Sequence, residues 1–388
     1  MWRLEMRILV DDSAAFNQGA GIGRYARNII PAAAAHLPGA DFRLLYAPSQ
    51  AGVPPFFDDI VTRFPEGTKV SVRRLPFSRR RADQLWFRAR LPLPARFFSG
   101  LVDIAYSPDF TLPPVGKIPR AITVHDLAFE VCPWVASDAL RRFLSTVVPR
   151  LVRSSTRVMA VSEATKTDIV ERYGTAADRI DVIPNGVDER FFRAGPLSSD
   201  ELASLGIPRD YLLMVGTLEP RKNHRGAFDA MKTLTGQVDL PLVVAGRAGW
   251  DDAPIYEAAR PLVEAGRVML LDYAPEGLLP NLYAGAAALL YPSWYEGFGL
   301  PVAEGLASGV PVVAGATPAL RETGGEHALY ADAGRPDEIG WRIVEALSSG
   351  QQSEAARSAR RTWARRWTWQ AAGHRLADVF RKMLENDE

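Results

Sequence analysis

The sequence of 388 residues has little cysteine and lacks the short motifs of several enzyme classes. Its single cysteine, Cys132, excludes a disulfide within the chain and fits a reducing compartment. The simplest role of this thiol is that of a small buried hydrophobe. No Gly-x-Ser-x-Gly elbow, no His-Glu-x-x-His and no Asp-x-Asp triplet occurs. Metal-supported diphosphate chemistry is therefore not indicated, and we expect neither a metal ion nor a cofactor.

Long hydrophobic runs are also missing. The uncharged stretch 305–320 contains three glycines and two prolines and does not predict a membrane-spanning helix. Arg3, Glu5 and Arg7 interrupt the first residues, which argues against a secretion signal. With 47% apolar residues and a net charge of +1, the composition is that of a cytoplasmic globular protein of two ordinary domains, without a nucleic-acid partner.

Short apolar runs alternate with helical patterns along the chain, which is typical of βαβ units and parallel sheets in an α/β protein. The expected strands are 7–11, 42–46, 104–106, 121–124, 157–161 and 180–183, then 211–215, 242–245, 268–270, 287–291 and 310–314. A loop-like segment, 191–208, follows Pro184-Asn185-Gly186 and separates the two halves. We expect domains at 1–190 and 191–360, and a C-terminal helix at 361–388 that returns to the first domain.

The most informative stretch runs from Glu296 to Glu304. Between these carboxylates lie Gly297, Phe298, Gly299 and Leu300. The stretch follows an expected strand and precedes a helix opened by Pro301, so it is a strand-to-helix loop. Such loops lie where ligands bind, and their glycines and free N–H groups suit a phosphate. Because the carboxylates can accept hydroxyl groups as well, the pattern indicates a nucleotide sugar. The alternative is that Glu304 only complements the helix dipole and Glu296 is solvated.

A second loop, after the strand 211–215, carries Gly216, Arg221 and Lys222. Cations at a helix start are unfavourable beside the positive end of the dipole unless an anion binds there. Two adjacent cations can neutralise a departing diphosphate. The pattern therefore favours a functional role over an ordinary charged helix start.

Two loops of the first half carry weaker signals. Gly21 and Gly23 belong to a glycine-rich turn before the helical run 24–37, which suits the close approach of a ligand. The second strand does not end in the acidic residue that a dinucleotide-binding dehydrogenase requires. His125 and Asp126 follow the strand 121–124 and can contact a sugar hydroxyl and an acceptor, although such a pair is more often structural.

Segment 71–98 contains eight arginines, one acidic residue and five aromatic residues. A basic, aromatic stretch of this kind can lie on an anionic membrane. It can equally be a solvated loop and helix whose aromatic rings join the core. Segment 358–384 has helical spacing with tryptophans among arginines, which suits packing between domains.

Taken together, the motifs resemble the retaining glycosyltransferases of the GT-B fold, family 4 type, and in particular the bacterial polysaccharide mannosyltransferases. The resemblance runs in order from about residue 7 to about residue 325 and rests on segments 21–25, 124–126, 161–163, 183–188, 216–223 and 296–304. It implies two Rossmann-like domains that face each other across a cleft, with the acceptor side in the first domain and the donor side in the second.

The resemblance also implies roles for the candidate residues. Glu304 would hold the ribose and Glu296 the donor sugar, Arg221 and Lys222 would bind the diphosphate, Gly21 and Gly23 would close over it, His125 would contact the transferred sugar, and Asp126 would lie toward the acceptor. Transfer would proceed with retention and without a bound metal, through a front-face departure in which the leaving phosphate helps to deprotonate the acceptor. Electrostatic stabilisation would then carry most of the catalysis.

From this resemblance we expect a GDP-mannose-dependent mannosyltransferase that acts on a lipid-linked glycan of a cell-surface polysaccharide such as lipopolysaccharide, on the inner face of the cytoplasmic membrane. GDP-rhamnose, GDP-fucose and UDP-sugars stay open as donors, because one sequence does not identify the residues that contact the base. Two further alternatives are a GT-B sugar-nucleotide epimerase and a catalytically silent nucleotide-sugar-binding subunit. The presence of Arg221, Lys222, Glu296 and Glu304 argues against silence.

Overall fold

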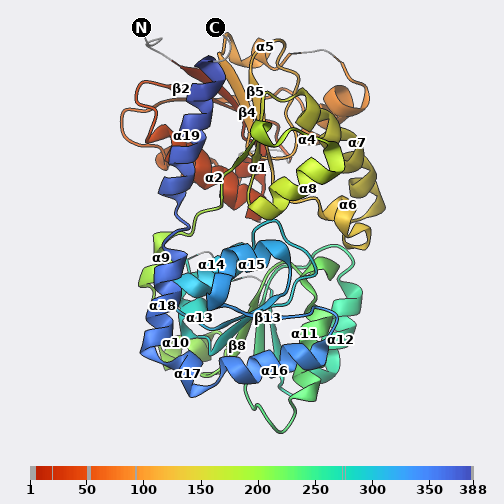
Figure 1. Ribbon diagram of the computed structural model, residues 1–388, viewed down its shortest axis with the longest axis vertical. Coiled ribbons are helices and arrows are strands. Elements are labelled where there is room, and N and C mark those ends of the chain that lie inside the picture. The colour runs from red at the N-terminus through yellow and green to blue at the C-terminus, as the bar shows by residue number, and fades with distance from the viewer. Residues whose placement is uncertain are drawn as a thin grey trace. The chain divides into compact units, whose positions relative to one another are not determined.

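The computed structural model describes residues 6–19, 21–49, 54–91, 94–272, 274–275 and 277–385. The chain divides into two compact units (Figure 1). Unit 1 comprises Met1–Leu127, Ala139–Gly186 and Thr368–Glu388, and unit 2 comprises Ala128–Asp138 and Val187–Trp367. The boundaries between the units lie after Gly186 and after Trp367, whereas the sequence suggested domain ends at residues 190 and 360. Segment 128–138, expected in the first domain, joins unit 2 because its apolar side chains, including Cys132, pack against Tyr295.

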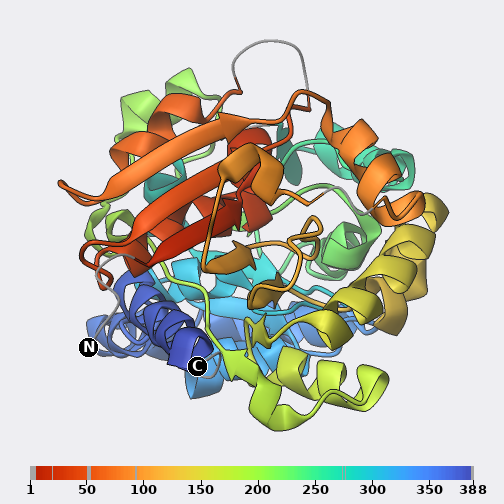
Figure 2. The same ribbon diagram turned by 90° about the horizontal axis from the view of Figure 1, so that it is seen from above.

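Unit 1 contains a parallel seven-stranded sheet in the order β3-β2-β1-β4-β5-β6-β7. Its strands are β1 (Arg7–Asp11), β2 (Asp41–Tyr46), β3 (Lys69–Arg74), β4 (Ile104–Ser107), β5 (Arg120–Val124), β6 (Arg157–Ala160) and β7 (Ile180–Val182). Figure 2 shows the red and orange strands of this sheet side by side. Most strands are buried on both faces, as expected for a parallel sheet covered by helices.

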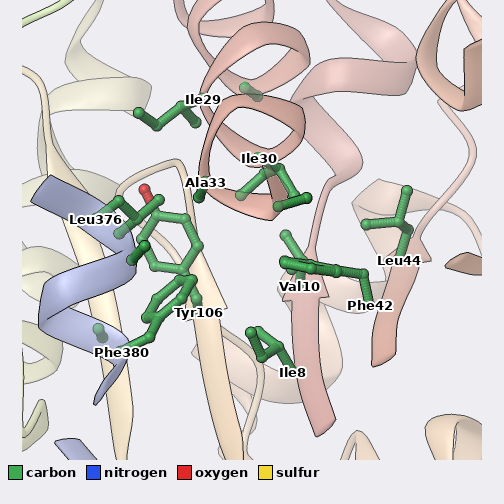
Figure 3. Packing of buried hydrophobic residues seen from close by; sticks show 14 of the residues in the cluster. Ile8, Val10, Ile29, Ile30, Ala33, Phe42, Leu44, Tyr106, Leu376 and Phe380 are labelled. Atoms are coloured by element: carbon green, nitrogen blue, oxygen red, sulfur yellow. The ribbon is translucent and has the colours of Figure 1, made fainter. Parts of the chain in front are cut away.

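The helices of unit 1 connect these strands. They are α1 (Ser13–Asn17), α2 (Gly21–Ala34), α3 (Phe57–Thr62), α4 (Arg79–Ala82), a π-helical turn (Asp83–Arg88), α5 (Arg96–Ser99), α7 (Asp138–Ser154), α8 (Glu163–Tyr173), a 3-10 turn (Ala177–Arg179) and α19 (Trp369–Glu385). The side chains of α2 and α19 pack with those of β1, β2 and β4 in one core (Figure 3). The last helix of the chain thus completes the core that the first strand begins.

Unit 2 contains a parallel six-stranded sheet in the order β10-β9-β8-β11-β12-β13. Its strands are β8 (Leu212–Val215), β9 (Leu242–Ala245), β10 (Val268–Leu271), β11 (Ala288–Tyr291), β12 (Val312–Gly315) and β13 (Leu329–Ala331). Its helices and helical turns are α6 (Ala128–Val131), Pro133–Val135, α9 (Glu189–Arg193), α10 (Ser199–Ser204), Pro220–Lys222, α11 (His224–Thr233), α12 (Ala253–Glu264), α13 (Leu279–Gly285), α14 (Leu300–Ala307), α15 (Pro318–Gly324), Gly325–His327, α16 (Pro336–Ala346), α17 (Ser349–Gln352) and α18 (Glu354–Ala364).

The two faces of this sheet receive different helices. Leu290 of β11 shares a core with α11, α12 and α16. Its neighbour Leu289 points to the other face, where its side chain approaches Gly305 of α14 so closely that an added Cβ would lie 2.8 Å from it. The alternation follows from the period of two in a strand. It brings α14, the helix that carries Glu304, directly against the sheet.

Each of the eleven expected strands overlaps an observed strand, and two observed strands were not expected. β3 is an edge strand with three basic residues and little full burial, so it shows no apolar run. β13 has only three residues. Because β3 occupies 69–74, the start of the basic segment is a strand and not a loop. The expected C-terminal helix is two helices, since α18 ends at Ala364 and α19 begins at Trp369. Among the described residues, none of the helices combines the length and apolar character needed to cross a bilayer.

A substitution at Gly373 tests the packing between α19 and α2. A Cβ added at Gly373 would lie 2.3 Å from the backbone carbon of Ala32, so backbone would have to move. We expect Gly373→Ala to lower the free energy of unfolding by about 1–3 kcal/mol, despite the better helix propensity of alanine. Gly350→Ala is the control, because no atom lies within 4 Å of its added Cβ. Urea unfolding of both variants checks this, and equal midpoints would contradict the close contact.

Candidate functional site

Two loops at the carboxyl edge of the unit 2 sheet bring three predicted residues together. The loop after β8 carries Arg221 and Lys222, and the loop after β11 carries Glu296. Gly216 begins the first loop with a φ of +150°, and the Lys222 side chain passes 3.7 Å from the position of its missing Cβ. Ligands of open α/β sheets bind at this edge.

Glu296 lies at the centre of the ion pairs. Its Oε2 accepts a hydrogen bond from Arg221 Nη1 at 2.7 Å, and its Oε1 accepts one from Lys222 Nζ at 2.6 Å. Tyr291 bridges the second pair, since its hydroxyl accepts from Lys222 at 2.6 Å and donates to Glu296 at 2.9 Å. On its other side, Arg221 donates to Glu219 Oε1 from Nη2 at 2.9 Å. The guanidinium is thus held between two carboxylates.

The pKa directions agree with a fully charged cluster. Burial alone would raise the pKa of Glu296, but the charges of Arg221 and Lys222 outweigh it and lower the pKa to about 2. Burial and the charge of Arg221 lower the pKa of Lys222, and Glu296 opposes that effect. Burial and the charge of Glu296 raise the pKa of Tyr291 well above its usual value, so the phenol keeps its proton. Burial, followed by the charge of Lys222, lowers the pKa of His224 to about 3, so it adds no third cation.

Asn223 connects the loops of this edge by hydrogen bonds and was not among the predicted site residues. It has a left-handed φ of 58° and caps α11 by accepting from the Gly226 N–H at 3.2 Å. Its Nδ2 donates to the carbonyls of Pro292 at 3.1 Å and Ala333 at 2.8 Å. Asparagine tolerates this backbone conformation and is a preferred N-cap, which was the available signal. The bond to Pro292 sets the spacing between the loop of the cations and the loop of Glu296.

The second predicted carboxylate, Glu304, lies one turn inside α14. Its side chain is buried, and Oε2 accepts a hydrogen bond from the Tyr283 hydroxyl at 3.0 Å. The sequence did not single out Tyr283, within α13, or Tyr291, at the end of β11, because a tyrosine among apolar residues is usually a core residue. Gly299 caps α14 with a φ of 89°, and an added Cβ would lie 2.2 Å from Leu320.

The other predicted residues of this loop differ in their surroundings. Phe298 is buried against Trp367, with ring centroids 5.4 Å apart, and its carbonyl accepts from Thr323 Oγ1 at 2.6 Å. Leu300 is buried at the start of α14. Gly297 lies in the bend between Glu296 and Phe298. Whether these residues bind a donor stays a prediction.

The predicted residues of the first half belong to unit 1. Gly21 and Gly23 lie in the first turn of α2 and not in a turn before it, so the expected helix starts earlier. Gly23 has a packing reason, because its Cβ would lie 2.0 Å from the Gln18 carbonyl oxygen. Among the described residues, no atom lies within 4 Å of a Cβ added at Gly21, so their packing does not explain this glycine.

His125 and Asp126 follow β5 at the carboxyl edge of the unit 1 sheet. His125 is buried, and its Nε2 lies 2.8 Å from the Pro108 carbonyl oxygen. Since a carbonyl only accepts, the proton resides on Nε2 and Nδ1 is left as an acceptor. Burial lowers the pKa of His125, which keeps the ring neutral. A neutral acceptor suits the contact with a sugar hydroxyl that the sequence predicts.

Arg79 was counted in the basic segment, but its side chain belongs to an internal cluster. It donates to Thr111 Oγ1 at 2.7 Å and lies 3.2 Å from Asp83 and 4.0 Å from Asp11. Burial acts to lower the pKa of Arg79, but the three carboxylates of Asp11, Asp83 and Asp109 raise it. Among the described residues, no group of three or more His, Cys, Asp or Glu side chains is arranged to hold a metal ion.

Comparisons with known proteins define the class. A family model described as "Glycosyl transferases group 1" matches residues 201–363, and one described as "Glycosyltransferase Family 4" matches residues 19–191. The chain is 30% identical over 365 residues to O-antigen chain mannosyltransferase B of Escherichia coli, covering 90% of this chain and 93% of that protein.

Solved structures agree in fold. Sucrose-phosphate synthase from Thermosynechococcus elongatus has a TM-score of 0.73 and 17% identity, with 99% of this chain and 100% of that chain covered. Anabaena Alr3699/HepE in complex with UDP-glucose has a TM-score of 0.73 and 18% identity, with 97% and 99% covered.

The chain is therefore a glycosyltransferase of the GT-B fold, as the sequence predicted. Within that class it belongs to family 4 and is of the bacterial mannosyltransferase type.

The ion pairs of Glu296 predict a pH dependence of stability. Because its pKa falls from 4.5 to about 2 on folding, its contribution is complete above about pH 4.5 and is lost as the pH falls toward 2. We expect the free energy of unfolding of the wild type to exceed that of Glu296→Gln by about 3 kcal/mol at pH 7. This difference should narrow below pH 4.5. Urea midpoints between pH 3 and 7 measure it. Glu257→Gln, on the exposed face of α12, should show no such trend, and a pH-independent gap for Glu296→Gln would refute the ion pairs.

Proposed function

We propose that the chain transfers mannose from GDP-mannose, with retention and without a metal ion or other cofactor, to a lipid-linked glycan of a cell-surface polysaccharide. The name of the relative that matches nearly the whole chain supports mannose as the sugar and a polysaccharide as the product. The observation that carries the proposal is the cluster of Arg221, Lys222 and Glu296 at the ligand-binding edge of the unit 2 sheet.

The cluster suits a departing diphosphate. Glu296 and Glu219 hold the two cations in place before a donor binds, so little reorganisation is needed when negative charge develops. Lys222 is buried and Arg221 has only 18% of its side chain exposed, so their interaction with an anion is stronger than in water. When the diphosphate takes over the cations, Glu296 is released to accept hydrogen bonds from the sugar hydroxyls.

The ribose and the acceptor have separate candidate contacts. Tyr283 fixes one carboxylate oxygen of Glu304, which orients the group for the ribose hydroxyls. In unit 1, the neutral His125 offers Nδ1 to a hydroxyl of the transferred sugar, and Asp126 follows it toward the acceptor. None of these groups is assigned as a base, and the leaving phosphate takes the acceptor proton in the proposed mechanism.

Radiolabelled donors test the proposal. Purified protein would be incubated with GDP-mannose, GDP-rhamnose, GDP-fucose or UDP-glucose and a lipid-linked glycan acceptor, each with and without EDTA. We expect label in lipid only from GDP-mannose, and equally with EDTA. Label from another donor would replace mannose in the proposal, and loss with EDTA that Mg²⁺ restores would refute metal independence. A free altered sugar nucleotide without transfer would identify an epimerase.

Arg221→Ala removes one preorganised cation from the leaving group. We expect kcat to fall about 100-fold or more, with KM changing far less, since the interaction strengthens as charge develops. Arg335→Ala, which breaks an exposed ion pair with Asp337 on the same unit, is the control and should keep wild-type turnover. Unchanged kcat for Arg221→Ala would remove this residue from the mechanism.

Substitutions of Glu304 and of Glu296 should have different effects on the affinity for free GDP. Glu304→Gln keeps an acceptor for Tyr283 but loses a charged contact to the ribose, so we expect GDP to bind about tenfold more weakly or worse. Glu296→Gln frees Arg221 and Lys222 from their carboxylate and should not weaken GDP, although transfer should fall. Calorimetry with GDP on both variants decides this, and equal weakening would contradict the division of roles.

We propose in addition that the basic segment 71–98 contacts the anionic membrane that carries the acceptor. Arg73, Arg74, Arg80 and Arg81 are exposed and have no ion-pair partner among the described residues. Exposed Phe97 lies in the same segment. Trp86 and Phe87 are buried instead, so part of the aromatic content serves the core.

Reversal of two charges tests the membrane contact. Each arginine near an anionic surface is worth about 1 kcal/mol, so Arg80→Glu with Arg81→Glu should weaken binding to phosphatidylglycerol vesicles at least tenfold. Transfer to a water-soluble acceptor analogue should hardly change. Lys232→Glu with Arg260→Glu, at exposed positions of unit 2, matches the charge change. Co-sedimentation at low and high salt measures binding, and a wild type that stays in the supernatant at low salt would end the membrane proposal.

A further inference from the structure

A pocket of unit 2 lies at the opposite edge of the sheet from the candidate donor site. Its volume is about 410 Å³, and its lining includes Asp210, Gln352, Arg357 and Arg361. Asp210 precedes β8, and other lining residues precede β11, so the pocket is at the amino edge of these strands. Volumes of this size are typical of sites for small molecules.

Three arginines of α18 lie beside this pocket on one helix face. Arg357, Arg360 and Arg361 have the i, i+3, i+4 spacing that makes them neighbours. Arg360 is buried and donates to the Gly309 carbonyl from Nε at 2.9 Å. Arg361 donates to the Ser308 carbonyl at 3.3 Å. Within the described part of the chain, none of the three arginines forms an ion pair with a carboxylate.

The helix end that these arginines contact does not balance their charge. The carbonyls of Ser308 and Gly309 follow α14. The C-terminus of this helix offers a partial negative charge of about half an elementary charge. Burial, together with the like charge of Arg357, lowers the pKa of Arg360 to about 10. Asp210, the one acidic residue of the pocket lining, is exposed. A concave site with two arginines in its lining and a third behind them therefore carries an unneutralised positive charge.

We propose that this pocket binds a small phosphate-bearing anion, held by the guanidinium groups of Arg357 and Arg361. Arginine is suited to the task because its planar fork donates two parallel hydrogen bonds to phosphate oxygens. Gln352 positions Arg357 by accepting a hydrogen bond from its Nη2 at 3.3 Å, while its own amide donates to the carbonyls of Ala287 and Ala346. The site is independent of the proposed transfer reaction, because it shares no residue with the cluster of Arg221, Lys222 and Glu296.

Calorimetric titration with inorganic pyrophosphate tests the site. Because Arg221 and Lys222 can also take pyrophosphate, the stoichiometry is compared among the wild type, Arg357→Gln with Arg361→Gln, and Arg221→Ala. We expect the double variant to lose one bound pyrophosphate per chain, or to bind it at least tenfold more weakly, while Arg221→Ala keeps that site. Arg342→Gln, at an arginine of α16 that pairs with Glu345, is the control for the loss of an arginine elsewhere on unit 2 and should titrate like the wild type.

The outcomes separate the pocket from the donor site. Equal stoichiometry and affinity in the folded double variant and the wild type would overturn the proposal, as would a single wild-type site that Arg221→Ala abolishes. Should the double variant not fold, phenylglyoxal labelling of the wild type, read by mass spectrometry, replaces it. Pyrophosphate should slow the labelling of Arg357 and Arg361 and leave Arg342 unaffected. Unprotected labelling of Arg357 and Arg361 at saturating pyrophosphate would equally overturn the site.

Discussion

The ion pairs of Glu296 with Arg221 and Lys222 are the interaction on which the candidate site depends. Three charged side chains are withdrawn from water here, and each would be costly to bury alone. Together they compensate one another, and Tyr291 satisfies a further position of both Lys222 and Glu296. The cluster therefore persists without a ligand and holds the cations in a fixed geometry. The same arrangement makes the site sensitive, since loss of Glu296 removes the carboxylate partner of the buried Lys222 and one of the two carboxylate partners of Arg221.

The backbone around the cluster is shaped to allow it. Gly216 and Asn223 adopt positive φ values at the two ends of the loop that carries the cations. Asn223 then connects that loop to Pro292, on the loop of Glu296. The strain of an asparagine in the left-handed region is offset by three hydrogen bonds from one side chain. Rigid strands supply the framework, and this one amide sets the spacing between their ends.

The fold was largely predictable from the sequence, and the site only in part. Strands such as β8 and β11 are continuous apolar runs, because both faces of a parallel sheet are buried. β3 escaped prediction because an edge strand needs no such run. The motifs singled out Arg221, Lys222 and Glu296, which the fold brings together, because they combine cations or a carboxylate with glycines in strand-to-helix loops.

The partners of these residues were not predictable. The hydroxyl of Tyr291 meets Lys222 across 69 positions of sequence, and Asn223 meets Ala333 across 110. No local pattern encodes such pairs. At Gly23 the sequence suggested a ligand, and the close approach of the Gln18 carbonyl is a second reason for glycine that only the fold shows. Arg79 belongs to the basic segment, but its guanidinium pairs with carboxylates that only the fold brings together.

The helix α19 has a consequence for the order in which the chain folds during synthesis. The last strand of the unit 1 sheet is complete at Val182, but Leu376 and Phe380 of α19 belong to the core of that sheet. At ribosomal rates, roughly 10–40 s separate these events. During that interval unit 2 is being synthesised, and the apolar face of α2 lacks the cover that α19 provides. We infer that unit 1 completes its core only after unit 2 has been synthesised, and that the apolar face of α2 needs shielding by chaperones until then.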